Sequence, residues 1–279
     1  MEFFDQFDGQ DEKDEIIPSP LNYTGSKFKM IKLLKSHFPK ESGSFYDLFT
    51  GGGSVFVNNL SFNKVYANDK IKPLIEFYGY LQKTPWEDVV KTIKSANISK
   101  DDPEAYSELR DRFNESGSYI DFFILVCSCT NNMMRFNKKL KFNQTFGKRN
   151  FNSSTEIKLK EYHKRIFNND NIIFTNEDYF NIIPEPNSFV YLDPPYLITE
   201  AGYNSYWSKE LELKFYDYID TLNKSGVKFM VSNVAEHKGK INPYLSRVEK
   251  YRTINVNFNY NKVSRSGESN SKEIIVVNY

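Results

Sequence analysis

Short apolar runs alternate with longer helical patterns along most of the chain. Runs such as "SFYDL", "KVYAN", "NIIFT", "NSFVYL", "VKFMVSN" and "KEIIVVNY" are rich in β-branched and aromatic residues, which is typical of buried strands. Helices are expected between them, for example where Met30, Ile31, Leu33 and Leu34 share one face, and again over "SKELELKFYDYIDTLNKSG". Alternating strands and helices predict an α/β fold with a doubly wound, mostly parallel sheet.

The middle of the chain departs from this alternation. Residues 80–165 contain the polar helical segments "WEDVVKTIKSA" and "EAYSELRDRFNES", the apolar segment "YIDFFILVCSC", and then a basic stretch. Because the alternation resumes afterwards, we interpret this block as an insertion. The organisation we expect is an acidic disordered leader (residues 1–16), an α/β domain formed by residues 17–79 and 166–279, and an inserted domain of residues 80–165.

The overall composition is that of an ordinary globular protein. Of the 279 residues, 39% are hydrophobic and 26% are charged. No apolar run approaches the ~18 residues of a membrane span. The start of the sequence lacks a signal-peptide pattern, so we expect a cytoplasmic protein with no membrane partner.

Metal and disulfide chemistry receive no support from the sequence. Cys127 and Cys129 are two positions apart, which does not match a zinc knuckle, so we expect two buried thiols. The three histidines, at 37, 163 and 237, are scattered along the chain. We therefore expect neither a metal site nor a histidine-based catalytic triad.

Charge is distributed unevenly along the chain. The net charge is +1, but residues 1–15 carry seven acids and one lysine (−6), which leaves +7 for the remainder. Residues 131–150, "NNMMRFNKKLKFNQTFGKRN", contain six bases and no acids. Such a stretch can be a solvated loop. Its bases, however, alternate with Asn, Gln and Phe, a pattern that favours contact with phosphates and base edges of a nucleic acid.

The segment "DLFTGGG" places a glycine turn between a predicted strand and a predicted helix. Glycines at 51–53 permit positive φ angles and a close approach of a ligand to the backbone. The turn is neither a phosphate loop nor GxGxxG, so on its own a structural role is equally consistent with it. Asp69 follows the next strand, where a carboxylate can bind ribose hydroxyls; alternatively, it only caps the helix near Lys72. Together, the turn and Asp69 indicate a nucleoside-containing cofactor.

The tetrapeptide "DPPY" (residues 193–196) follows the strand "NSFVYL", at the strand end where open α/β sheets place their chemistry. The side chain of Asp193 and the carbonyl of Pro194 are two acceptors that can hold both hydrogens of an exocyclic amine. Pro194 and Pro195 stiffen the backbone, and Tyr196 offers a flat face for a stacked base. The turn therefore predicts a rigid cradle for an aromatic amine.

Taken in order, the segments "NYTGSK", "DLFTGGG", "ND", "DPPY", "SN" and "KEIIVVNY" resemble the Dam-like family of DNA adenine-N6 methyltransferases, which use S-adenosylmethionine. The resemblance begins at about residue 18 and extends to the last residue; each segment can occur by chance, but the ordered set is highly specific. It implies a Rossmann-like methyltransferase sheet with an inserted, mainly helical target-recognition domain that carries a β-hairpin. It also implies methylation of a flipped adenine in a short duplex DNA motif, in a restriction–modification system or by a phage or solitary methylase.

The resemblance implies roles for individual residues. The cofactor-binding positions are Tyr23, Lys27, Asp47, Phe49, Gly51, Gly53, Asp69 and Asp178, with Asp69 on the ribose and Asp178 on the adenine of S-adenosylmethionine. The catalytic positions, which would hold the target adenine, are Asp193, Pro194, Pro195 and Tyr196. DNA contacts are expected at Arg135, Asn137, Lys138, Lys139, Lys148 and Arg149.

The resemblance also leaves alternatives open. The segment "MMRFN" departs from the "YRVN" or "YRYN" of GATC-methylating members, so the recognition sequence stays undefined. Related folds methylate RNA adenine, cytosine N4 or protein glutamine, and a noncatalytic DNA-binding protein could keep the fold. An Asp before the two prolines favours adenine by family habit. The implied partners are double-stranded DNA and, functionally, a cognate restriction endonuclease, with a monomer or weak dimer as the expected state.

Overall fold

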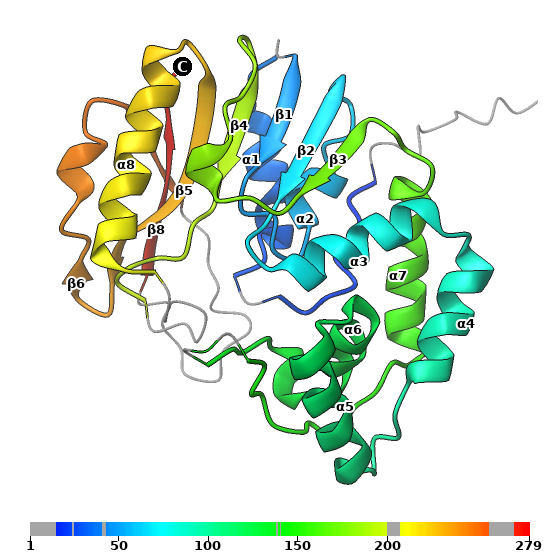
Figure 1. Ribbon diagram of the computed structural model, residues 1–279. Helices are drawn as coiled ribbons and strands as arrows, with labels where there is room; N and C mark the ends of the chain where they lie inside the picture. Colours follow the sequence, from blue (N-terminus) through cyan, green and yellow to red (C-terminus); the bar gives the residue numbers. More distant parts are fainter. Residues whose placement is uncertain are drawn as a thin grey trace, which may run out of the picture.

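An eight-stranded sheet organises the part of the chain that the structure describes, which is residues 15–23, 25–40, 43–137, 139, 141–199, 207–256 and 271–279 of a computed structural model. The strand order is β3-β2-β1-β4-β5-β8-β7, and β6 pairs with β5 (Figure 1). The strands are β1 (Ser44–Asp47), β2 (Lys64–Asn68), β3 (Ile172–Thr175), β4 (Phe189–Leu192), β5 (Lys228–His237), β6 (Lys240–Ile241), β7 (Arg252–Val256) and β8 (Ser271–Val277).

The sheet is parallel in its central part and antiparallel at one side. The five strands from β3 to β5 in this order run parallel to one another, whereas β8 is antiparallel to both β5 and β7. The chain passes from β1 outward to β2 and β3 and then returns to β4 on the other side of β1. Open sheets bind ligands at such a reversal of strand order. The predicted α/β fold with a mostly parallel sheet is therefore confirmed.

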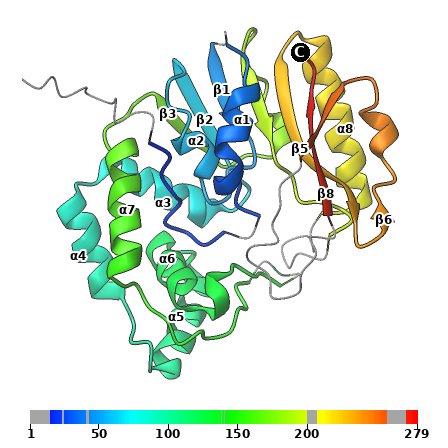
Figure 2. The same ribbon diagram turned by 180° about the vertical axis from the view of Figure 1, so that it is seen from behind.

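Alternating side chains on the strands build two cores, one on each face of the sheet. On β1, Phe45 packs in the core that contains α1 (Ile31–His37), and Tyr46 packs in the core that contains α8 (Lys209–Lys224). Phe189 and Val190 of β4 divide in the same way. Successive side chains of a strand point to opposite faces, which explains why both are apolar here. Figures 1 and 2 show α8 and α1 on opposite sides of the sheet.

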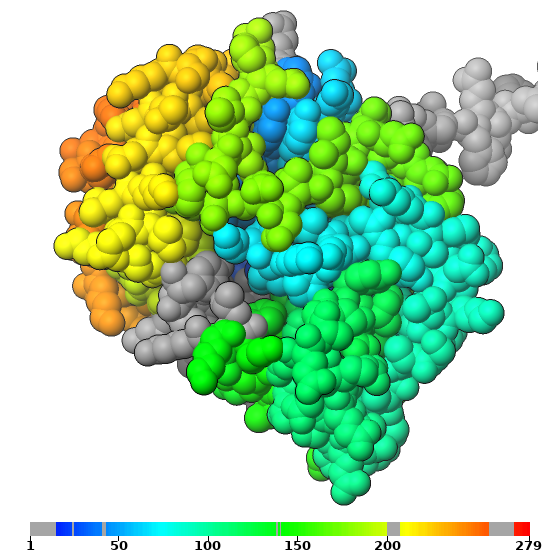
Figure 3. All heavy atoms as spheres, in the orientation of Figure 1, coloured from blue at the N-terminus to red at the C-terminus, as the bar shows by residue number. Residues whose placement is uncertain are grey.

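A group of helices lies beyond the carboxyl ends of the parallel strands. It consists of α3 (Lys72–Lys83), α4 (Trp86–Ala96), α5 (Pro103–Ser116), α6 (Tyr119–Ser128) and α7 (Ser153–Ile166). In α6 every residue from Asp121 to Ser128 is buried, as expected for a helix that is apolar on all sides. It contacts α3, α4 and α5 and so forms the centre of the group. Figure 3 shows these helices as a lobe below the sheet.

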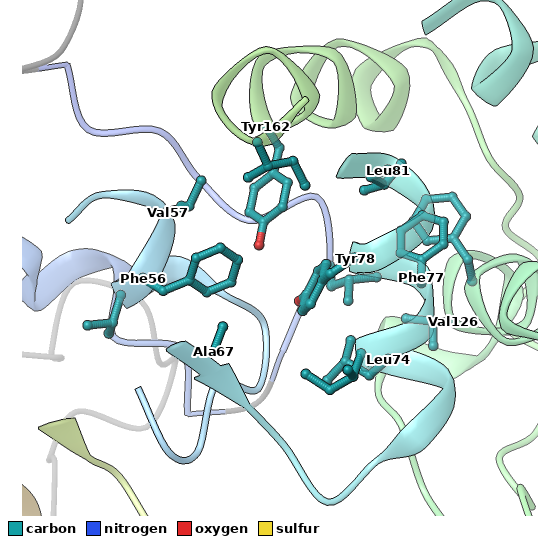
Figure 4. Packing of buried hydrophobic residues seen from close by; sticks show 14 of the residues in the cluster. Phe56, Val57, Ala67, Leu74, Phe77, Tyr78, Leu81, Val126 and Tyr162 are labelled. Atoms are coloured by element: carbon teal, nitrogen blue, oxygen red, sulfur yellow. The ribbon is translucent and has the colours of Figure 1, made fainter. Parts of the chain in front are cut away.

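Within this lobe, helix α7 packs directly against the α/β core. Its Tyr162 packs against Tyr78 of α3, with ring centroids 5.7 Å apart, and against Phe56 of α2 (Ser54–Val57), at 6.1 Å. Figure 4 shows the three rings converging on one another. Because α2 follows the glycine turn directly, the lobe contacts the base of that turn.

Several local features differ in extent from the sequence pattern. The helix expected after the glycine turn is only four residues long. Strand β7 was not predicted, because its sequence "RTINV" is mostly polar and only Val256 is buried. The expected hairpin consists of two isolated antiparallel bridges, Cys129–Phe146 and Phe136–Phe142. Within the described ranges, no helix is both long and apolar enough to cross a membrane.

Candidate functional site

A cavity of about 910 Å³ lies at the carboxyl ends of β1, β2 and β4. Its walls include the glycine turn after β1, Asp69 after β2 and the "DPPY" turn after β4. The far side is formed by the end of α5 and by residues of the basic segment. The parallel strands therefore bring three sequence motifs to one edge of the sheet, and the helical lobe closes over them.

The glycine turn presents its backbone to this cavity. Gly51 has a φ of 49°, and a Cβ at Gly51 or Gly52 would lie 2.9 Å or 2.8 Å from the side chain of Tyr23. The Gly51 carbonyl accepts a hydrogen bond of 2.9 Å from the hydroxyl of Tyr78. Gly53 has a φ of 77°, and a Cβ there would overlap the Tyr162 hydroxyl. Side chains are excluded by sterics at all three positions, and at Gly51 and Gly53 also by the positive φ angle.

Asp69 connects the glycine turn to helix α3. Its Oδ2 accepts a hydrogen bond from the backbone N–H of Gly51 at 2.8 Å, and its Oδ1 accepts one from Ile71 at 2.9 Å. Burial raises the pKa of this carboxyl, and the backbone hydrogen bonds oppose that rise. Each carboxylate oxygen has a second lone pair. Asp69 thus holds the residue that precedes α3 and also lines the cavity. It does not cap the helix, because the bonded N–H belongs to Ile71 and α3 has no side-chain cap.

Asp47 lies beneath the turn and not among the residues that line the cavity. Only 1% of its surface is exposed, and its Oδ2 accepts a hydrogen bond of 3.2 Å from the N–H of Phe56. Its Oδ1 has no hydrogen-bond partner within the described part of the chain. Burial, together with the negative charges of Asp193 and Asp69, raises the pKa of Asp47 well above its ordinary value.

The "DPPY" turn is held by a buried ion pair. Oδ2 of Asp193 lies 2.8 Å from Nζ of Lys27, and Oδ1 accepts a hydrogen bond of 2.7 Å from the hydroxyl of Tyr196. The Lys27 ammonium also lies 5.3 Å from the centre of the Tyr196 ring. Burial and the adjacent Asp193 charge raise the pKa of Tyr196 well above its ordinary value. Lys27 lines the cavity, but its pairing with Asp193 was not predicted from the sequence.

Aromatic rings form one wall of the cavity. The centroid of Phe49 lies 5.1 Å from that of Tyr179 and 5.9 Å from that of Trp207, and all three residues line the cavity. Trp207 donates a hydrogen bond of 2.5 Å from its indole nitrogen to the buried carboxylate of Glu212. Sequence reasoning identified Phe49 but missed Tyr179, Trp207 and Glu212. An aromatic residue next to an already predicted Asp178 was the only signal available for Tyr179.

Asp178 lies at a more exposed rim of the cavity. Its Oδ1 pairs with Nζ of Lys70 at 2.8 Å, and 39% of the Asp178 side chain is exposed. Both residues line the cavity, as does Tyr23. Of the predicted cofactor residues, only Asp47 and Gly53 lie outside the cavity wall. Gly53 ends the glycine turn, and Asp47 accepts a hydrogen bond from the helix that follows it.

Of the predicted DNA-contacting residues that the structure describes, Asn137 and Lys139 line the cavity and the others do not. Arg135 is tied across the hairpin, because its guanidinium donates to the side chain and carbonyl of Asn143 at 3.1 Å and 2.7 Å. The side chain of Asn137 accepts hydrogen bonds from the N–H groups of Lys139 and Lys141 at 2.8 Å and 3.1 Å. Asn137, Lys139 and Lys141 line the cavity, whereas Arg135 does not.

The remaining basic positions lie away from the cavity. Arg149 donates a hydrogen bond of 2.8 Å to the side chain of Asn132, and Lys148 has a positive φ of 51°. Neither residue lines the cavity. Lys138, which the sequence also singled out, lies outside the described residues.

The described ranges contain no group of three or more His, Cys, Asp or Glu side chains that could hold a metal ion. The two cysteines are free and buried, as predicted. Burial raises the pKa of the Cys129 thiol to about 12, so it is not a reactive thiolate.

The sheet order, the glycine turn and the prolyl turn at one edge define the chain as an α/β protein of the Rossmann-like methyltransferase class. A family model for D12 class N6 adenine-specific DNA methyltransferases matches residues 23–265, and the chain belongs to this family. This result confirms the family that the ordered motifs predicted.

Curated relatives agree with the family assignment. The chain is 34% identical to "Modification methylase StsI" from Streptococcus sanguinis, over 94% of the chain and 43% of that protein. It is 31% identical to "Type II methyltransferase M.FokI" from Planomicrobium okeanokoites, over 97% of the chain and 44% of that protein. It is 24% identical to "DNA adenine methylase" from Serratia marcescens, over 69% of the chain and 73% of that protein. The chain thus spans less than half the length of the first two relatives.

Proposed function

We propose that the chain is a site-specific DNA adenine methyltransferase. It would transfer a methyl group from S-adenosylmethionine to the N6 amino group of an adenine flipped out of a short duplex motif. The observation that carries this proposal is the continuity of the cavity, which joins the glycine turn, the "DPPY" turn and the tip of the basic hairpin in one space. A cofactor, a flipped base and the neighbouring duplex can therefore meet there.

The cavity fits S-adenosylmethionine by its chemistry. Gly51 and Gly52 line the cavity, and the Tyr23 side chain packs in the space that a Cβ at either position would need. Asp69 is a buried acceptor suited to ribose hydroxyls, and Asp178 is an acceptor suited to the adenine amino group. Phe49 and Tyr179 supply flat apolar surfaces for the remainder. When bound, S-adenosylmethionine supplies a methyl group that is activated by its attachment to a sulfonium.

The chain's own residues would position and polarise the target adenine. Asp193 and the carbonyl of Pro194 accept the two amino hydrogens, which directs the nitrogen lone pair toward the methyl donor. These acceptors become more favourable as the nitrogen acquires positive charge. The ion pair with Lys27 fixes Asp193 in this orientation. The N6 proton becomes far more acidic once the nitrogen is methylated, so Asp193 does not have to act as a strong base beforehand.

Flipping the adenine out of the duplex costs a few kcal/mol. Stacking on Tyr196 offsets this cost by on the order of 1–3 kcal/mol. We assign the duplex contacts to an inserted recognition domain at residues 80–165, where Lys139 and Lys141 line the same cavity as the "DPPY" turn. The lysines would contribute salt-dependent affinity for phosphates. Sequence readout would come from other groups near the hairpin tip.

The biological setting follows from the substrate and from relatives whose names describe modification methylases and a type II methyltransferase. We propose a cytoplasmic protein, monomeric or weakly dimeric, that modifies DNA alongside a cognate restriction endonuclease. The endonuclease would be a functional partner and need not bind the methylase.

The test is methylation of plasmid DNA by the purified protein with S-adenosylmethionine, mapped base by base by single-molecule sequencing. We expect N6-methyladenine confined to one short motif, and its loss in Asp193→Ala. Methylation of cytosine N4, or of RNA supplied in parallel, would redirect the proposal to those substrates. DNA binding that is indifferent to both the cofactor and Asp193→Ala would indicate a noncatalytic DNA-binding protein.

A further inference from the structure

Glu212 is a buried carboxylate beside the aromatic wall of the cavity. It lies in the first turn of α8, and only 2% of its surface is exposed. Its Oε2 accepts a hydrogen bond of 2.5 Å from Trp207 Nε1, and its Oε1 accepts one of 3.0 Å from the Tyr216 hydroxyl. Burying a carboxylate is costly even when it is hydrogen-bonded, and an apolar side chain could fill the same space. The carboxylate therefore points to a role beyond packing.

The network behind Glu212 is rigid. The Tyr216 hydroxyl also accepts a hydrogen bond of 3.1 Å from the side chain of Asn233 on β5. The Asn233 side chain in turn accepts one of 2.7 Å from the N–H of Val234. Trp207 is therefore connected through Glu212 and Tyr216 to the backbone of a central strand. The hydrogen bond to Glu212 therefore orients the Trp207 ring.

Trp207 is one of three neighbouring aromatic residues that line the cavity, together with Phe49 and Tyr179. It meets Phe49 edge to face, at 5.9 Å and 75°, and lies 6.0 Å from Tyr179. Cations bind favourably over the faces of aromatic rings, and Trp is the strongest of these partners. A hydrogen bond from the indole N–H to a carboxylate shifts electron density into the ring. That shift strengthens the attraction of the ring face for a cation.

We propose that Glu212 is a positioning residue that makes the wall of Trp207, Phe49 and Tyr179 a recognition element for the sulfonium cation of S-adenosylmethionine. This inference rests on the proposed function. The product, S-adenosylhomocysteine, differs from the cofactor by the methyl group and the positive charge on sulfur. The wall would therefore help the protein to distinguish the charged cofactor from its neutral product.

The test uses the chain's small number of indoles. It has two tryptophans, so Trp86→Phe leaves Trp207 as the sole reporter of binding. In this background the dissociation constants of S-adenosylmethionine and S-adenosylhomocysteine are measured by fluorescence and by titration calorimetry.

Glu212→Gln is compared with Glu210→Gln, which removes an equal charge from an exposed position in the same first turn. We expect Glu212→Gln to weaken binding of the cofactor about 3- to 10-fold more than binding of the product. Glu210→Gln should leave the ratio of the two constants unchanged.

A second variant keeps the inference testable if Glu212→Gln does not fold. Trp207→Phe retains a ring but lacks the N–H group, and calorimetry should show the same loss of preference for the charged ligand. Equal weakening of both ligands, or no change in their ratio, would overturn the inference and leave Glu212 a structural residue. That result is distinct from failure of the proposed function, in which the folded parent protein would bind neither ligand.

Discussion

The ammonium of Lys27 lies 2.8 Å from Oδ2 of Asp193, so the first motif of the chain is joined directly to the prolyl turn that follows β4. The Lys27 side chain is 6% exposed and that of Asp193 is 18% exposed. The other carboxylate oxygen accepts the Tyr196 hydroxyl, so each oxygen of Asp193 has an ordered partner. An ion pair this shielded from solvent is screened little by salt.

Replacing Lys27 with Met should destabilise the fold through this pair. Removing one partner of a fully buried ion pair costs about 3–5 kcal/mol, and the residual exposure of Asp193 lowers our expectation to about 2 kcal/mol. The loss should be smaller when Asp193 is already Asn, because no carboxylate is then left unpaired. Urea unfolding of the two single variants and the double variant should give a coupling energy of about 1–3 kcal/mol.

Lys29→Met is the matched control, since Lys29 is an exposed lysine two positions away. Its effect on the free energy of unfolding should stay within about 0.5 kcal/mol. Strictly additive effects of Lys27→Met and Asp193→Asn would contradict a stabilising role for the ion pair.

Gly53 in the glycine turn and Gly79 inside α3 should respond to alanine in opposite directions. Gly53→Ala forces a side chain onto a backbone with φ of 77° and into the Tyr162 hydroxyl. It should cost more than about 2 kcal/mol and weaken cofactor binding. Gly79 lies inside α3 with open space around its Cβ position, so Gly79→Ala should stabilise by about 0.5–1 kcal/mol. Thermal unfolding of the pair measures both; a stabilised Gly53→Ala would refute the packing at the turn.

Asn114, at the end of α5, should control the hairpin. Its side chain accepts a hydrogen bond of 2.7 Å from the N–H of Phe142 and donates one of 3.0 Å to the carbonyl of the same residue. Asn114→Ala leaves both groups without this partner, which typically costs about 1–3 kcal/mol. We expect the dissociation constant for duplex DNA to rise about tenfold, while cofactor affinity stays unchanged.

Fluorescence anisotropy with a labelled duplex would measure the DNA affinity of Asn114→Ala, and calorimetry would measure cofactor affinity. The exposed Glu108 on the same helix gives the control variant Glu108→Ala, which should change neither affinity. A parallel loss of DNA and cofactor affinity in Asn114→Ala would indicate general unfolding and not a displaced hairpin.

The sheet was predictable because its strands are buried on both faces. Runs such as "SFYDL" and "NSFVYL" are apolar at consecutive positions, and parallel strands covered by helices require that pattern. The motifs at the strand ends were predictable for a different reason, because glycine and proline have few other uses at a strand end. Strand β7 escaped prediction because it lies at the sheet edge with polar, exposed residues.

The missed features of the site are pairings between residues far apart in sequence. Lys27 with Asp193, and Asn114 with Phe142, involve residue types that occur on any surface, so no local pattern marks them. Even Trp207 and Glu212, which are close in sequence, look like an ordinary start of an amphipathic helix. Only the packing of the helical lobe and α8 against the strand ends makes these side chains neighbours. Sequence patterns report burial and periodicity, and such pairings depend on neither.

Asp47 should make the stability of the protein fall as pH rises above about 4. Burial, with the charges of Asp193 and Asp69, raises the pKa of this carboxyl well above its unfolded value of 3.8. Between the two values the folded protein holds a proton that the unfolded chain has lost. The stabilising contribution is therefore complete below the unfolded pKa and is lost as pH rises toward the folded one, at up to about 1.4 kcal/mol per pH unit.

Asp47→Asn cannot titrate, so its free energy of unfolding should decline less than that of the wild type between about pH 4 and about pH 7. Urea unfolding across this range measures the difference, with Asp101→Asn as the exposed control that should follow the wild type. Parallel profiles for Asp47→Asn and the wild type would show that Asp47 is ionised in the folded protein.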